Sequence, residues 1–288
     1  MTNAAVWVRG AFFTPPPALS SIRVWQVVRA ASAHDGRCGD MAFTLPLGSG
    51  RTAIVMVDVA GHGATRAPLA SAIAGAITAE LLGGASPAAA LGCADDRLRR
   101  FADESPYAVA FVALVHPALR TVVYASAGHD VAFTLAEDGR LRHLGPTAPM
   151  LGVPYAVHVC DAVLSLEAGE TLVIVTDGVA DSRPAGSDDF FGDERTACAV
   201  ARSLRRGGDP ARGVLDAACA HAGGRQTDDI GVVVARIVAA GGAGAATHPS
   251  PGDGILFACE GLIYGAWPAQ APFTSMIRRS GARRGPCR

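Results

Sequence analysis

The stretch that most constrains the fold of this chain covers residues 52–64. An apolar run at 53–57, rich in β-branched residues, predicts a buried β-strand. The strand delivers Asp58 at its carboxyl end, and Gly61 and Gly63 then turn the chain toward an alanine-rich helix. A charged carboxylate at the edge of an apolar strand is costly unless a cation compensates it. The pattern therefore predicts a site at this strand end, with a metal ion or an arginine as the compensating charge.

Composition narrows the classes of protein that the chain can belong to. Its 288 residues are half hydrophobic, and the formal net charge of −1 provides no overall attraction to nucleic acid or anionic lipid. The seven cysteines are scattered without a Cys-x-x-Cys pair, which favours a reducing compartment over a disulfide framework or a zinc ribbon. The amino terminus has no signal-peptide pattern, and the longest apolar helix candidate, residues 69–82, falls short of the ~20 residues that span a bilayer. We expect a soluble, cytoplasmic protein.

Hydrophobic periodicity and turn residues divide the chain into strands and helices. Strands are expected at residues 22–31, 41–47, 53–57, 108–115, 121–125, 131–135, 156–164, 170–176 and 230–238. Helices are expected at residues 65–82, 87–102, 193–206 and 210–221. The short turns between strands, among them Gly48-Ser49-Gly50, indicate antiparallel hairpins, not a parallel doubly wound sheet. The predicted fold class is α+β, with two sheets covered by helices.

Acidic residues at several predicted strand ends are the candidate functional groups. They lie beside a glycine, an apolar strand residue or a second acid, and they are Asp40, Asp58, Asp177 and the pair Asp228-Asp229. Carboxylates that converge without histidine or cysteine suit Mg²⁺ or Mn²⁺, and a pair of such ions can activate a shared water for phosphoryl transfer. Each acid taken alone is a weak signal, since Asp-Gly is most often an ordinary turn.

The acids belong to an ordered set of five short motifs. In chain order these are Cys38-Gly39-Asp40, Asp58-Val59-Ala60-Gly61-His62-Gly63, Ala127-Gly128-His129, Thr176-Asp177-Gly178-Val179 and Asp228-Asp229-Ile230. The set resembles the metal-dependent PPM-type protein serine/threonine phosphatases, above all their bacterial branch of stage II sporulation protein E-like and sigma-factor regulatory phosphatases. The resemblance covers residues 22–238, which would form the phosphatase domain. Residues 1–21 would be an irregular arm, and residues 239–288 a Gly/Ala/Pro-rich linker with a disordered basic tail.

The resemblance implies a β-sandwich of two mainly antiparallel sheets in α-β-β-α layers, and a dinuclear Mn²⁺ or Mg²⁺ site. Asp58 would bridge the two ions, and the Val59 carbonyl would be a further ligand. Asp177 and Asp228 would complete the site, and Asp40 would assist through water. A metal-bridging hydroxide would then attack phosphoserine or phosphothreonine without a phospho-enzyme. By the same resemblance, the substrate would be a phosphorylated STAS-type anti-anti-sigma factor in a bacterial cytoplasm.

Other polar residues lie in or near these motifs, and the three that follow first have two interpretations each. His62 is either a general acid toward the leaving oxygen or a cap of the following helix. His129 lies in a tight turn, where a structural role competes with metal ligation. Asp229 is expected to hydrogen-bond around the metal ligands, with direct ligation as the alternative. Asp130 and Asp181 are expected to be solvated turn acids.

Two other functions remain open at this point. A non-catalytic, metal-binding scaffold for partner switching would keep the same fold, and a hydrolase of small phosphate esters would need a deep pocket. We expect no sensor domain before the catalytic segment, so an activating signal would arrive through a regulatory partner or expression, and a homodimer is a further option. The arginines near the carboxyl terminus favour a solvated tail over nucleic-acid contact, and no membrane partner is expected.

Overall fold

The structure is a computed structural model, and it describes residues 22–31, 38–61, 66–100, 107–155, 157–167 and 169–238. The expected arm at 1–21 and the expected linker and tail at 239–288 lie outside these residues.

Two five-stranded antiparallel sheets form the centre of the described part of the chain. The first sheet has the order β2 (Asp40–Pro46), β3 (Thr52–Val59), β4 (Ala108–His116), β5 (Thr121–Ala127) and β8 (Ala162–Ser165). The second has the order β1 (Ile22–Arg29), β10 (Ile230–Ile237), β9 (Thr171–Val175), β6 (Ala132–Leu135) and β7 (Leu141–His143). The predicted hairpin of β2 and β3 is confirmed, and the 3-10 turn η2 (Gly48–Gly50) joins its strands.

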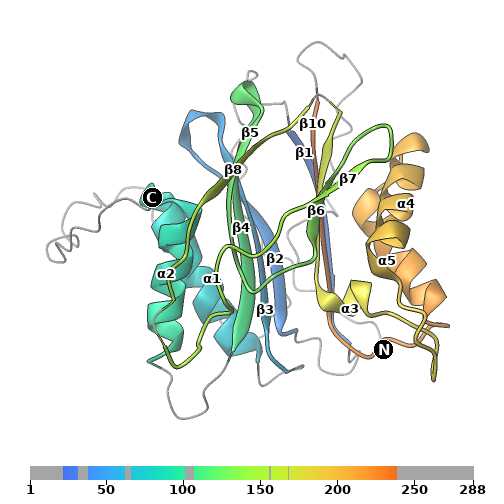
Figure 1. The fold of residues 1–288 in the computed structure, drawn as a ribbon, viewed down its shortest axis with the longest axis horizontal. Helices are drawn as coiled ribbons and strands as arrows, with labels where there is room; N and C mark the ends of the chain where they lie inside the picture. Colours follow the sequence, from blue (N-terminus) through green and yellow to red (C-terminus); the bar gives the residue numbers. More distant parts are fainter. Residues whose placement is uncertain are drawn as a thin grey trace, which may run out of the picture.

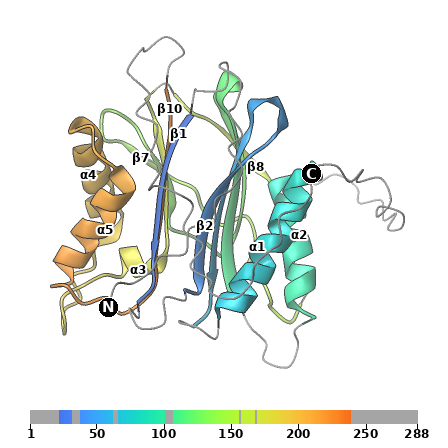
Figure 2. The ribbon, with the colours of Figure 1, turned by 180° about the vertical axis from the view of Figure 1, so that it is seen from behind.

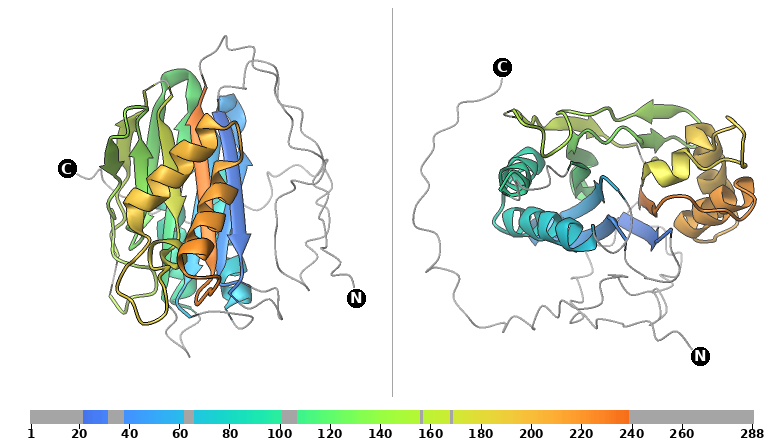
Figure 3. Two further views of the ribbon diagram at one scale, coloured as in Figure 1. Left: turned by 90° about the vertical axis from the view of Figure 1, so that its right-hand side faces the viewer. Right: turned by 90° about the horizontal axis from the view of Figure 1, so that it is seen from below.

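Helices cover the outer faces of both sheets. They are α1 (Ala67–Leu82), α2 (Pro87–Leu98), the one-turn α3 (Asp177–Ala180), α4 (Gly192–Arg205) and α5 (Pro210–His221), and a second 3-10 turn, η3, spans Pro117–Leu119. The pair α1 and α2 lies on the first sheet, and α4 and α5 lie on the second, on opposite sides of the molecule (Figures 1 and 2). Seen end-on, the order is helices, sheet, sheet, helices (Figure 3). The predicted α+β sandwich is confirmed. None of the described helices has the length and apolar character that crossing a membrane requires.

The alternation of side chains along β3 shows how one strand serves two apolar layers. Ala53, Val55 and Val57 pack toward α1 and α2. Ile54 and Met56 point the other way, into the core between the two sheets. Both faces of β3 are therefore buried, which is why its sequence is continuously apolar and does not alternate. Each valine, isoleucine or methionine of this strand contributes about 1.5–3 kcal/mol when fully buried.

Local signals fix the starts of two helices where the sequence predicts them. The Ser86 hydroxyl accepts a hydrogen bond from the backbone N–H of Ala89 at 3.3 Å, at the beginning of α2. The Asp209 carboxylate accepts one from the N–H of Arg212 at 3.0 Å, at the beginning of α5. A proline follows each capping residue, where its missing N–H costs nothing.

Some predicted elements differ from the structure. The strand expected at 156–164 is wrong in its first half, since β8 begins only at Ala162. The reason is tertiary: Asp161 accepts a hydrogen bond from the backbone N–H of Ala88 at 2.7 Å, which ties the preceding segment to α2 instead of to β5. The helix expected at 87–102 ends at Leu98. The short β7 and α3 were not predicted, because neither is long enough to show a periodicity.

Candidate functional site

Two of the predicted acids face each other at one end of the first sheet. Asp40 begins β2, Asp58 is the last but one residue of β3, and the two are partners in the antiparallel register. The sequence analysis ended this strand at residue 57, just before Asp58. In the structure, Asp58 lies within β3. It follows Ile54 and Met56 on the face directed at the second sheet. Both carboxylates thus belong to the space between the sheets. Asp40 is 5% exposed, and Asp58 is partly buried.

The second sheet contributes the other acids at the same end. Thr176, the residue after β9, is tied to Gly231 of β10 by two hydrogen bonds, since its N–H donates to the Gly231 carbonyl at 3.0 Å and its hydroxyl accepts from the Gly231 N–H at 2.8 Å. Asp177 continues from this closed pair into α3, and Asp228 precedes β10. In Figure 1, α3 marks this end of the sandwich at the bottom of the view.

Asp229 joins the two sheets. Its Oδ2 accepts a hydrogen bond from the backbone N–H of Gly39 at 2.7 Å, and its Oδ1 accepts one from the N–H of Ala31, also at 2.7 Å. Both donors belong to the connection between β1 and β2, so one buried carboxylate holds the chain that leads into Asp40. This is the hydrogen-bonding position expected for Asp229.

Position 178 requires glycine for a steric reason that the sequence did not reveal. A Cβ atom at this position would stand 1.9 Å from the carbonyl oxygen of Asp229, far inside contact distance. The absence of a side chain at Gly178 therefore lets α3 approach the backbone of Asp229, just before β10. This close approach brings Asp177 and Asp228 onto neighbouring segments. Gly39 has a milder version of the same role, because a Cβ there would lie 3.1 Å from the Gly61 carbonyl oxygen and 3.4 Å from that of Val59.

The electrostatics show that these acids share one environment. Burial, followed by the charge of Asp177, raises the pKa of Asp58 from 3.8 to about 7. Burial and the charge of Asp58 raise the pKa of Asp40 well above its ordinary value. Burial and the charge of Asp228 raise the pKa of Asp177. Carboxylates that raise one another's pKa are destabilised as anions, and a bound cation would stabilise their charged form.

The residues fit hard divalent cations in a water-rich site. Among the described residues, no three His, Cys, Asp or Glu side chains are grouped so that they could hold a metal ion as they stand. Mg²⁺-type ions use only one or two carboxylates each and keep several waters, so such a cage is not required. The donors present are oxygens, and the buried Oδ2 of Asp40 has no hydrogen-bond partner. That orphaned acceptor points to a ligand, ion or water at this position.

The remaining polar residues in or near the motifs differ in their surroundings. His62 lies outside the described residues, so its two interpretations stay as predictions. His129 is 3% exposed, its ring is 5.9 Å from that of Phe111, and burial lowers its pKa to about 4, as in a core histidine. Asp130 and Asp181 are exposed, as expected, yet their charges also contribute to the raised pKa of Asp177.

A cleft opens beside the acids, and part of its lining was missed by the sequence reasoning. Its volume is about 490 Å³, and it is lined by Asp177, Asp181 and Asp228 together with Arg183 and Arg225. No motif contains the two arginines, so only their place in the fold identifies them.

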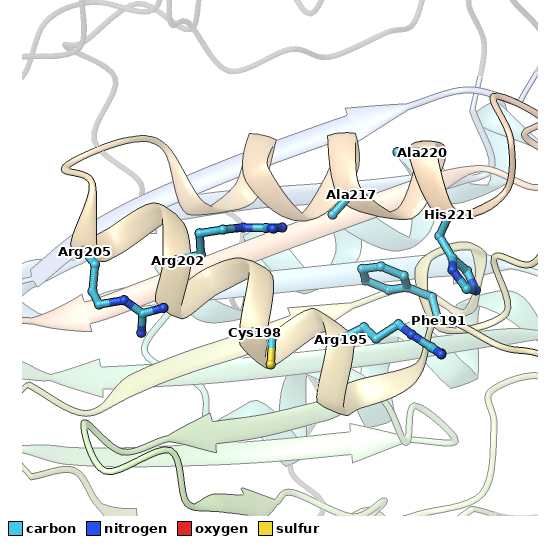
Figure 4. Close-up of a pocket in the computed structure, with 8 residues that line it drawn as sticks. All are labelled: Phe191, Arg195, Cys198, Arg202, Arg205, Ala217, Ala220 and His221. Atoms are coloured by element: carbon cyan, nitrogen blue, oxygen red, sulfur yellow. The ribbon is translucent and has the colours of Figure 1, made fainter.

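A second hollow, of about 510 Å³, lies between α4 and α5. Figure 4 shows Phe191, Arg195, Arg202 and His221 around it. None of the predicted acids lines it, so we do not assign the chemistry of the acids to this hollow.

Comparisons with known proteins show the family and the fold of this chain. Residues 48–238 match the family described as stage II sporulation protein E (SpoIIE). Protein IcfG of Synechocystis is 32% identical over 94 residues, which cover 32% of this chain and 14% of that protein. This chain therefore matches only a small part of its curated relative.

Solved structures share the fold at low identity. The SiaA-PP2C domain of Pseudomonas aeruginosa has a TM-score of 0.63 at 22% identity, covering 74% of this chain and 85% of that one. The RsbU and RsbW domains of Rv1364c from Mycobacterium tuberculosis give 0.62 at 23% identity, with coverage of 76% and 60%. The catalytic domain of the serine threonine protein phosphatase PstP, in complex with 2 manganese ions, gives 0.56 at 15% identity, with coverage of 76% and 99%.

The family match extends over most of the described residues, and the two-sheet sandwich is the fold of PP2C-type phosphatases. The chain belongs to the stage II sporulation protein E (SpoIIE) family.

Proposed function

We propose that this chain hydrolyses phosphoserine or phosphothreonine on a regulatory protein with the help of two Mn²⁺ or Mg²⁺ ions. The observation that carries the proposal is the convergence of Asp40, Asp58, Asp177 and Asp228 at one end of the sandwich, beside an open cleft. Acids from both sheets meet there, and three of them have raised pKa values. A site that gathers this much negative charge is suited to cations and, through them, to a phosphate group.

The residues divide into roles by position. Asp58 interacts electrostatically with Asp40 in its own sheet and with Asp177 and Asp228 of the second sheet, which suits it to bridge two ions. Asp177 and Asp228 would complete the ligand set, the Val59 carbonyl would add a backbone oxygen, and Asp40 would act through a water. When bound, such ions polarise phosphoryl oxygens and make a water nucleophilic at neutral pH. The chain's own contribution is to hold the carboxylates in register through Thr176 and Asp229.

The proposed substrate class is based on the relatives that share the family or the fold. One structural relative consists of RsbU and RsbW domains, and the family is described as stage II sporulation protein E. We therefore propose a phosphorylated STAS-type anti-anti-sigma factor as the substrate, in a bacterial cytoplasm. A regulatory partner or a second copy of this chain would supply the activating signal. Residues 22–238 would be the phosphatase domain.

Binding and turnover of the full chain test the proposal separately. Calorimetric titration should show Mn²⁺ binding, and the loaded protein should hydrolyse p-nitrophenyl phosphate and a phosphorylated STAS protein. Asp177→Asn should weaken Mn²⁺ binding and reduce both rates on the order of 100-fold or more, since loss of metal-site partners alone costs 10–100-fold. Asp216→Asn, an exposed acid of α5, is the matched control and should behave like the wild type.

Three outcomes would contradict the proposal. Hydrolysis that survives Asp177→Asn would remove the acids from the chemistry. Metal binding without turnover of either substrate would favour the alternative of a non-catalytic, metal-binding scaffold for partner switching. Turnover of p-nitrophenyl phosphate that small esters inhibit, and phosphoprotein does not, would favour a small-ester hydrolase.

A further inference from the structure

The cleft beside the acids carries both signs of charge. Asp177 and Asp228 lie in it, and Arg183 and Arg225 line it from two different loops. No described carboxylate lies within ion-pair distance of either guanidinium, although other arginines, such as Arg99 with Asp95 and Arg142 with Glu170, are paired at 2.7 and 3.1 Å. Two unneutralised cations in a cleft that already contains acids are available to an anionic ligand.

The loop that carries Arg183 is a closed structure. The backbone N–H of Phe191 donates to the Ser182 carbonyl at 2.9 Å, which closes the base of the loop. The Ser182 hydroxyl donates to the Gly178 carbonyl at 2.7 Å, which ties that base to α3. At the other side, the Arg183 guanidinium lies over the Phe190 ring, 4.5 Å from its centroid. A cation above an aromatic face is restrained while its N–H groups stay free to donate at the edge.

Arg225 is placed by the turn between α5 and β10. The Gln226 side-chain amide donates to the carbonyl of Asp228 at 2.9 Å and to that of Arg29 at 3.0 Å. These bonds tie the turn to the end of β1, so the backbone around Arg225 is held next to the acids. The two arginines therefore stand on separately anchored loops that share one cleft with Asp177 and Asp228.

We propose that Arg183 and Arg225 form a recognition subsite for an acidic side chain adjacent to the phosphorylated residue of the protein substrate. The proposal rests on the proposed function, because it takes the reacting phosphate to be held at the acids. Guanidinium groups pair with carboxylates through parallel hydrogen bonds, so a substrate with Asp or Glu in this position gains binding energy. The subsite lies beside the reacting centre and contributes to substrate binding, so its effect belongs chiefly in KM and not in kcat.

Two phosphoserine peptides test the subsite, one with Asp and Glu on both sides of the phosphoserine and one with Asn and Gln there. The Mn²⁺-loaded wild-type chain should prefer the acidic peptide in kcat/KM, and Arg183→Gln with Arg225→Gln should lower that preference roughly 3- to 20-fold, as expected for two exposed ion pairs. Arg206→Gln, an exposed arginine just past α4, is the charge-matched control and should keep the wild-type preference. Raising the salt concentration should weaken the preference in the wild type.

A third substrate and a binding measurement make each failure distinct. A loss on p-nitrophenyl phosphate as large as that on the acidic peptide would overturn the subsite, because it would place the arginines on the reacting phosphate. Equal affinity of the wild type for both labelled peptides in fluorescence anisotropy would also overturn it, whether or not they are hydrolysed. Discrimination in binding without hydrolysis of any substrate would support the subsite and count against the proposed phosphatase activity alone.

Discussion

Replacing Asp58 by asparagine in metal-free protein should change how the free energy of unfolding depends on pH. The Asp58 pKa lies at about 7 in the folded chain and at 3.8 when the side chain is unperturbed. The folded state therefore binds more protons than the unfolded state between these values, so this residue's contribution to stability falls as the pH rises from about 4 to about 7. Asparagine has no proton to lose and removes that dependence.

The magnitude follows from the shift. From pH 5 to about pH 7 the carboxyl stays protonated in the folded chain and is ionised in the unfolded chain. This span of about two pH units corresponds to ~3 kcal/mol at ~1.4 kcal/mol per unit. His129 acts in the opposite direction, because burial lowers its pKa from 6.5 to about 4, so its contribution rises with pH between those values. His129 is present in both proteins, and its effect cancels in the difference between wild type and variant.

Urea unfolding in the presence of EDTA, at about pH 5 and about pH 8, measures this difference. Asp58→Asn should gain ~3 kcal/mol relative to the wild type on going to the higher pH. Added Mn²⁺ at the higher pH should then stabilise the wild type more than the variant, since binding to the folded state adds RT ln(1 + [L]/Kd). Parallel pH profiles of the two proteins in EDTA would refute the inference that Asp58 lies in a cluster of repelling carboxylates.

Other changes test the scaffold of the site. Asp229→Asn keeps only one acceptor for two backbone N–H groups at 2.7 Å, so it should lower stability by ~2 kcal/mol, seen as a lower Tm; an unchanged Tm would contradict the bridging role. Gly178→Ala should cost about 1–3 kcal/mol and reduce hydrolysis, whereas Gly92→Ala in α2, where a Cβ meets nothing within 4 Å, should stabilise slightly in the same melts. Asp209→Ala should cost ~1 kcal/mol in urea unfolding through the lost helix cap and leave kcat unaltered.

Elements with a strong local pattern were predictable. The continuous apolar run in β3, the hairpin glycines and the capped start of α2 each depend on neighbours in sequence, so these predictions agree with the structure. Elements decided by distant contacts were not predictable. Asp161 accepts a hydrogen bond from the start of α2 just before β8, and two hydrogen bonds to Gly231 hold Thr176, the residue before α3.

The sequence by itself identified the acids that are candidate ligands of hard cations and showed that they follow or precede apolar strands, because both properties are local. It also supplied the ordered motifs that identify the family. Only the tertiary structure decided that Asp40 pairs with Asp58 across two strands, that Asp229 ties the β1–β2 connection to the second sheet, and that Arg183 and Arg225 share a cleft with the acids. The physical reason is that the interaction between two charges depends on their separation in space. For residues far apart along the chain, the fold sets that separation.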